Sequence, residues 1–120
     1  MSGAWARASA PGQTDGALYF VIEPAADDVL LAVRVPESVA DHAEIHEELA
    51  DDEGRMTMRQ IGDGLELDGG DTTVFQPGGL HVMLVALAGP LVDGGTFDAT
   101  LEFEAADPVS VPVRIAQTAP

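Results

Sequence analysis

The sequence predicts an all-β protein, and three observations lead to this prediction. Short runs rich in β-branched and aromatic residues recur along the 120 residues, whereas few windows show a helical period. Clusters of Gly, Pro and Asp separate these runs at positions that favour tight turns. Alternate residues of 80–86 and of 97–103 are apolar, which supplies faces for a core. Together these features are typical of a β-sandwich or barrel.

The predicted strands cover residues 4–9, 17–23, 29–35, 43–49, 55–61, 65–68, 72–76, 80–87, 96–104 and 109–116. The run at 43–49 is ambiguous, because its Ala, Glu and Leu residues also suit a helix. No repeat, linker or low-complexity block divides the chain. We therefore expect a single domain over residues 1–120, with ends that fray at about 1–3 and 117–120.

The charge balance limits the partners. The chain has 21 acidic residues against five arginines and no lysine, a net charge of −16. Nucleic acid is excluded as a partner, because phosphate binding needs basic side chains. The acidity indicates either solubility in a salty environment or attraction of cations and basic partners. The absence of cysteine excludes disulfides, thiolate zinc sites, iron–sulfur clusters and the His₂Cys blue-copper site.

Histidine and methionine, both scarce here, occur together on strand faces. His81 and Met83 share one face of the run 80–87, opposite the residues assigned to the core. Met56 and Met58 share a face of the run 55–61. His46 shares its face of the run 43–49 with neighbouring glutamates. We expect His46, His81 and Met83 to point away from the packed interior.

Imidazole and thioether groups suit a narrow class of ligand. Thioether sulfur is soft and neutral, and among biological metals it favours Cu(I). Calcium and magnesium prefer oxygen donors, and zinc gains little from methionine. A site of this kind suits carrying an ion rather than catalysis. The sequence shows no Ser/His/Asp grouping and no phosphate-binding glycine loop, so we expect neither an enzyme nor a small-molecule substrate.

Each of these residues also has an ordinary structural interpretation. A single methionine in a strand usually fills a core, and a single histidine is usually a hydrogen-bonded group. We expect His42 to lie at the surface and Trp5 to pack rather than to form a binding platform. The metal interpretation gains strength only from the combination of His-x-Met, Met-x-Met and the upstream histidine.

This combination resembles the PCu(A)C (PCuAC) family of copper chaperones. The matching elements are His46-Glu47, Met56-Thr57-Met58-Arg59 and the stretch "PGGLHVML" at 77–84. The flanking segments "AWARASAPGQTDGALYFVIE" and "LEFEAADPVSVPVRI" resemble the opening and closing strands of the family, so the resemblance covers nearly the whole chain.

The resemblance implies a set of Cu(I) ligands, with Cu(II) as a second form of the cargo. These ligands are His46, Met58, His81 and Met83, with Met56 and Glu47 as auxiliary candidates. The interval from His46 to Met58 is one residue longer than the family pattern, so Met56 is an alternative to Met58. The segment "EELADDEG" that follows His46 is expected to form a solvated acidic turn, or else a negative rim that attracts cations.

The resemblance further implies a cupredoxin-like, Greek-key β-sandwich that works outside the cytoplasm. The sequence as written begins without an apolar export leader. The implied function is delivery of Cu(I) to the binuclear copper-centre subunit of cytochrome c oxidase, with a Sco-type copper protein as collaborator. Two alternatives stay open: a β-sandwich interaction module, and a Cu(II) or zinc storage protein that uses His46, His81 and a glutamate.

Overall fold

All regular structure in the described chain is β-strand. The computed structural model describes residues 2–10, 12–50, 52–62, 64–77 and 79–117, and for residues 2–3, 49–50, 56 and 58–59 only the backbone. The strands are β1 (Ser2–Arg7), β2 (Gly16–Ile22), β3 (Asp28–Arg34), β4 (Ala40–Ala50), β5 (Met56–Gln60), β6 (Leu65–Leu67), β7 (Thr73–Val74), β8 (Leu80–Leu87), β9 (Thr96–Phe103) and β10 (Val109–Ala116). No helix within the described residues has the length and apolarity to cross a membrane.

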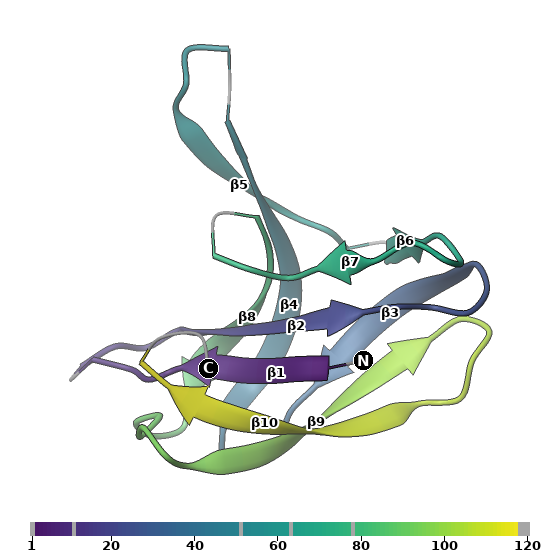
Figure 1. Ribbon diagram of the computed structural model, residues 1–120. Helices are drawn as coiled ribbons and strands as arrows, with labels where there is room; N and C mark the ends of the chain where they lie inside the picture. The colour runs from purple at the N-terminus through teal and green to yellow at the C-terminus, as the bar shows by residue number, and fades with distance from the viewer. Residues whose placement is uncertain (1, 11, 51, 63, 78, 118–120) are drawn as a thin grey trace.

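The strands form one continuous sheet that curls into a nearly closed barrel (Figure 1). Its order is β5-β4-β8-β2-β1-β10-β9-β3-β6, with β7 paired to β2 off this path. Strands β1 and β10 are parallel, while the other paired strands are antiparallel. Strand β3 also lies against β4 outside the ladder, which brings the two ends of the sheet together. The predicted all-β class is confirmed, and so is the position of every predicted strand to within a few residues.

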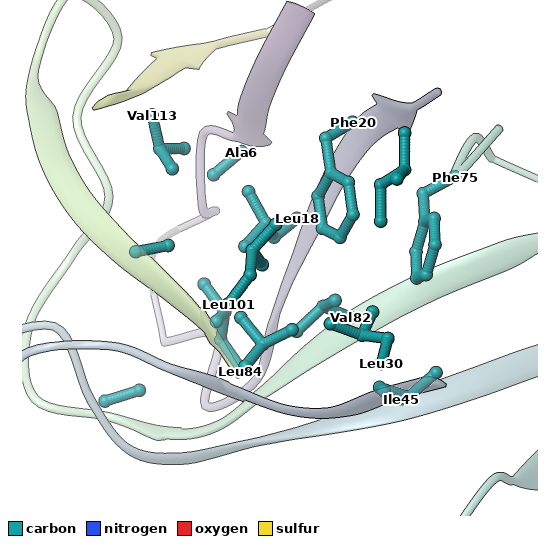
Figure 2. Close-up of a cluster of buried hydrophobic side chains, with 14 of the residues drawn as sticks. Ala6, Leu18, Phe20, Leu30, Ile45, Phe75, Val82, Leu84, Leu101 and Val113 are labelled. Atoms are coloured by element: carbon teal, nitrogen blue, oxygen red, sulfur yellow. The ribbon is translucent and has the colours of Figure 1, made fainter. Parts of the chain in front are cut away.

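The core fills the inside of the curled sheet (Figure 2). Phe20 of β2 stacks on Phe75 with ring centroids 4.3 Å apart. The largest fully buried side chains are Phe20, Leu18, Leu30, Leu67, Leu84, Leu101, Val82 and Val113. Burial of each such side chain stabilises the fold by about 1.5–3 kcal/mol, so these alternating apolar positions hold the barrel together.

Strand β4 is longer than the sequence predicted and has no helical part. It runs over eleven residues and pairs on one side with β5 and on the other with β8. These two ladders override the helical propensity of its Ala, Glu and Leu residues. The acidic segment after His46 was expected to be a turn, but Glu47–Ala50 continue the strand, and the turn is confined to the tip of the β4–β5 hairpin. This hairpin projects from the barrel (Figure 1).

The two faces of β8 follow the predicted alternation with one exception. Val82 and Leu84 are fully buried in the core, and Leu80 packs against it. Ala86 was expected to continue this face, but it is exposed and adopts a left-handed φ of 57°. Its amide donates a hydrogen bond to the Asp15 carboxylate (3.2 Å), so the strand twists out of its regular alternation at this residue.

Candidate metal site

The β4–β8 ladder brings two of the predicted ligands face to face. His46 of β4 lies directly opposite His81 of β8, and Glu44 lies opposite Met83. Directly opposed residues project from the same face of an antiparallel sheet, with Cβ atoms about 5 Å apart. One face of the sheet therefore carries His46, His81 and Met83 together.

The β4–β5 ladder extends this face toward the third segment. Gln60 pairs with His46, and Met58 pairs with Glu48. Met58 thus occupies a backbone position diagonal to His46, while Met56 pairs with Ala50, one full pleat repeat further along. The side chains of Met56 and Met58 lie outside the described residues, so their predicted roles rest on backbone register alone.

The two histidines are less accessible than the sequence suggested. His81 is only 6% exposed, and the His46 side chain is 12% exposed. They lie on the face away from the core, as alternation predicted, but that face is itself covered at this point. Their ring centroids are 5.7 Å apart with planes inclined by 29°. Because metal–imidazole bonds are about 2 Å long, one ion shared by both rings requires a nitrogen of each ring to point toward a common position.

One ring nitrogen in this pair has no partner. The Nδ1 atom of His46 is buried and accepts or donates no hydrogen bond among the described residues. Its Nε2 lies 2.9 Å from Oε1 of Glu44. In His81, Nδ1 lies 3.3 Å from the carbonyl oxygen of Gly79, which leaves Nε2 as the nitrogen available to a ligand. A buried nitrogen without a hydrogen-bond partner is rare in folded proteins, and coordination to a metal ion is one way to satisfy it.

Glu44 connects this pair to the third histidine. Its second oxygen, Oε2, lies 3.0 Å from Nε2 of His42, whose Nδ1 lies 2.8 Å from the Asp41 carboxylate. The hydrogen bonds from His46 and His42 lower the pKa of Glu44, and those to Asp41 and Glu44 raise the pKa of His42. The predicted surface position of His42 is confirmed, since its side chain is 48% exposed.

Glu47, the predicted auxiliary ligand, lies on the other face. It is opposite Leu80 of β8 and Arg59 of β5, and therefore alternates with His46 rather than sharing its side of the sheet. The carboxylates on the His46 face are instead those of Glu44 and Glu48. The register therefore separates Glu47 from the His46 face, and its part as an auxiliary ligand stays a prediction.

A cavity of about 330 Å³ adjoins His81 and Met83. It is lined by Arg7, Gln13, Asp15, Gly16, Ala17, Tyr19, Glu48, His81 and Met83. Burial raises the pKa of Tyr19, and the ring of Tyr19 packs on Trp5 with centroids 4.9 Å apart. The sequence did not assign Tyr19 and Arg7 to the site; the signal for Tyr19 was its position on the outward face of β2, opposite its core neighbours.

The described residues contain no group of three His, Asp or Glu side chains placed to hold a metal ion. What the sheet face does offer is nitrogen from two imidazoles with thioether sulfur from Met83 beside them. This donor set fits a soft ion better than a hard one.

Comparison with known proteins places this face in a family context. Residues 1–115 match the family model described as "Putative lipoprotein LpqE-like". The chain belongs to this LpqE-like family. It is 31% identical over 116 residues to putative lipoprotein Lxx21020 of Leifsonia xyli subsp. xyli (strain CTCB07), covering 95% of this chain and 68% of that protein.

Solved structures share the fold of this LpqE-like chain. The apo PCuAC domain from PmoF1 is 28% identical with a TM-score of 0.74, covering 98% of this chain and 91% of that one. The copper-bound PCuAC domain from PmoF2 has a TM-score of 0.75 at 23% identity (97% and 90% covered). The Cu(I) form of DR1885 from Deinococcus radiodurans has a TM-score of 0.74 at 23% identity (97% and 76% covered). The predicted resemblance to PCuAC domains, and with it the cupredoxin-like β fold, is confirmed.

Proposed function

We propose that this LpqE-like protein is a Cu(I) carrier that holds its cargo with His46, Met58, His81 and Met83. The observation that carries the proposal is the buried Nδ1 of His46, which has no hydrogen-bond partner among the described residues, in a ring whose centroid lies 5.7 Å from that of His81. An unsatisfied buried nitrogen costs about 1–3 kcal/mol. Coordination of an ion removes that cost.

The donor chemistry supports Cu(I) as the cargo. Two imidazoles and two thioethers are all neutral, so the bound ion keeps its single positive charge. The protein has a net charge of −16, which attracts cations to its surface. Without a thiolate in the chain, the donor set favours carrying the ion and releasing it by ligand exchange over rapid electron transfer. The copper-bound PCuAC relatives of the same fold support the same cargo.

The finer parts of the proposal rest on the family. The description of family members as putative lipoproteins supports work outside the cytoplasm. The resemblance to PCuAC chaperones supports residues 1–120 acting as one copper-binding domain without enzymatic activity. We further propose that the acceptor is the copper-centre subunit of cytochrome c oxidase, reached together with a Sco-type protein.

Anaerobic titration of the apoprotein with Cu(I) against a competing chelator tests the proposal. We expect one tightly bound Cu(I) per chain. Substitution His81→Ala or Met83→Ala should weaken binding by more than about 100-fold, because loss of an outer hydrogen-bond partner alone typically costs 10–100-fold. Val85→Ala is the matched control, since Val85 follows Met83 on the same face of β8 and lies opposite His42.

Unchanged affinity in both His81→Ala and Met83→Ala would remove the assigned site. X-ray absorption at the copper edge identifies the donors directly. Sulfur scattering beside nitrogen supports the carrier, whereas a shell of nitrogen and oxygen alone would favour the storage alternative. A wild-type protein that binds no Cu(I) would favour the interaction module.

A further inference from the structure

The most specific unexplained feature of this sheet face is the position of the Glu44 carboxylate. Its Oε1 lies 2.9 Å from Nε2 of His46, and its Oε2 lies 3.0 Å from Nε2 of His42. The three residues alternate along β4 and therefore share one side of the strand. Held at both oxygens, the carboxylate has little freedom to turn away from His46.

This contact determines which nitrogen of His46 carries the proton. An ionised carboxylate only accepts hydrogen bonds, so Nε2 of His46 must be the donor. In the neutral imidazole the other nitrogen, Nδ1, then carries a free lone pair. Nδ1 is also the atom that is buried and has no partner among the described residues. The nitrogen prepared for a metal is therefore Nδ1.

His81 is arranged in the opposite sense. Its Nδ1 donates to the carbonyl oxygen of Gly79, which also accepts the Glu48 amide. The lone pair of His81 is therefore on Nε2. Metal-binding histidines usually donate their second ring N–H to a carboxylate or a backbone carbonyl, which fixes ring orientation and raises ligand basicity. His46 has the first kind of partner and His81 has the second.

We propose that Glu44 is a positioning residue that orients His46 to bind copper through Nδ1, while His81 binds through Nε2. This inference deepens the proposed function and rests on it for the identity of the ion. The tautomers, however, are a property of the protein without copper. An experiment can therefore disprove the copper cargo without disproving the role of Glu44, and the reverse.

Glu48 provides a matched control for Glu44. It lies on the same strand and the same face, two residues after His46, and it lines the cavity beside His81 and Met83. Its backbone amide donates a hydrogen bond to the carbonyl oxygen of Gly79. Removal of either carboxylate subtracts the same charge from this face. Only removal of Glu44 takes away the partner of His46 Nε2.

The first measurement is the tautomer of each histidine in the apoprotein. Long-range ¹H–¹⁵N correlation spectra at neutral pH distinguish protonated from unprotonated ring nitrogens. We expect a proton on Nε2 and none on Nδ1 for His46, and the reverse for His81. A proton on Nδ1 of His46 in the wild-type apoprotein would overturn the proposal whether or not the protein binds copper.

The second measurement compares variants. Glu44→Ala should convert His46 to a mixture of tautomers and weaken Cu(I) binding by about 10–100-fold. Glu44→Gln should restore most of the affinity and the single tautomer, because the amide oxygen still accepts from Nε2. Glu48→Ala removes the same charge from the same face but leaves the partner of His46 Nε2 in place, so it should keep the single His46 tautomer and weaken Cu(I) binding less than Glu44→Ala does.

The outcomes separate the two proposals. Equal losses in Glu44→Ala and Glu48→Ala would assign the effect to charge alone and overturn the positioning role. Full affinity with a single unchanged tautomer in Glu44→Ala would do the same. If wild-type protein shows the expected tautomers but binds no Cu(I), the copper carrier is wrong and the role of Glu44 in fixing the His46 ring stands.

Discussion

The two faces of strand β8 are both largely covered, but they differ in what their covered side chains need. On its inner face, Val82 and Leu84 are fully buried among aliphatic and aromatic side chains. On its outer face, His81 is 6% exposed and Met83 is half-buried beside a cavity. The inner face leaves no polar atom to satisfy, whereas the neighbouring His46 leaves a buried nitrogen without a partner among the described residues. Burial alone therefore does not distinguish a hydrophobic core from a binding site. A buried polar atom without a hydrogen-bond partner does.

The largest effect should come from the inner face. Leu84→Ala removes a fully buried side chain and should lower the free energy of unfolding by about 2–5 kcal/mol, because it combines lost burial with a cavity. Chemical denaturation of the apoprotein measures this change. Leu31→Ala is the control, since Leu31 is 47% exposed and its truncation should cost much less.

The same Leu84→Ala protein, while folded, should bind Cu(I) with nearly the wild-type affinity. A large loss of affinity without global unfolding would show that the two faces of β8 are coupled. The inner face of β8 would then contribute to Cu(I) binding as well as to stability.

A smaller effect should distinguish the two methionines of β5. Met58 is diagonal to the His46–Gln60 pair, whereas Met56 lies four residues from Gln60, about 13 Å along the strand. Met58→Ala should therefore weaken Cu(I) binding by more than about tenfold, equivalent to about 1.4 kcal/mol, and Met56→Ala should change it little. Competition titration measures both. If Met56→Ala weakened Cu(I) binding more than Met58→Ala, the sulfur ligand would instead be Met56, nearer the tip of the β4–β5 hairpin.

The smallest effect concerns Asp28, far from the candidate ligands in the sheet order. Its carboxylate accepts hydrogen bonds from the amides of Val29, Ala105 and Ala106, at 2.7–3.0 Å, which join the start of β3 to the turn after β9. These bonds lower its pKa. Its contribution to stability is therefore present above the unfolded-state pKa of about 3.9 and is lost as the pH falls through the lower folded-state pKa.

Asp28→Asn should accordingly destabilise the protein at neutral pH, and the difference from wild type should shrink as the pH is lowered from about 5 to 2. Urea denaturation midpoints across this range measure it, with Asp93→Asn in an exposed turn as control. A difference that stays constant with pH would show that shape, not charge, explains the role of Asp28. Cu(I) affinity at neutral pH should be unchanged.

Much of the fold was predictable from sequence because its signals are local. The alternation in β8 and β9 and the Gly, Pro and Asp turns determine strand positions directly. The helical propensity of residues 43–49 could not be resolved locally, since the pairing of β4 with both β5 and β8 decides it. The left-handed Ala86 was likewise unpredictable, as it depends on a contact with Asp15, 71 residues away.

The candidate site was predictable as a set of residue types and less so as an arrangement. Period-two alternation predicted that Glu44 and His46 share one face of their strand and that His81 and Met83 share one face of theirs. The pairing of β4 with β8 shows that both pairs lie on the same face of the sheet. Glu47 was kept as an auxiliary candidate, although the register puts it on the opposite face from His46. The burial of His81 and the hydrogen bonds of Glu44 depend on side-chain torsions and on the cover supplied by distant strands, which spacing does not encode.

The ladder between β4 and β8 has a consequence for local opening of the fold. With the proposed ligands, the β4–β5 hairpin carries one nitrogen and one sulfur, and β8 carries the other two donors. Separation of these two strands would divide the coordination shell in half. Cargo binding thus acts as a clamp across this seam, and amide hydrogen exchange along it should slow when copper is loaded and recover when copper is handed on.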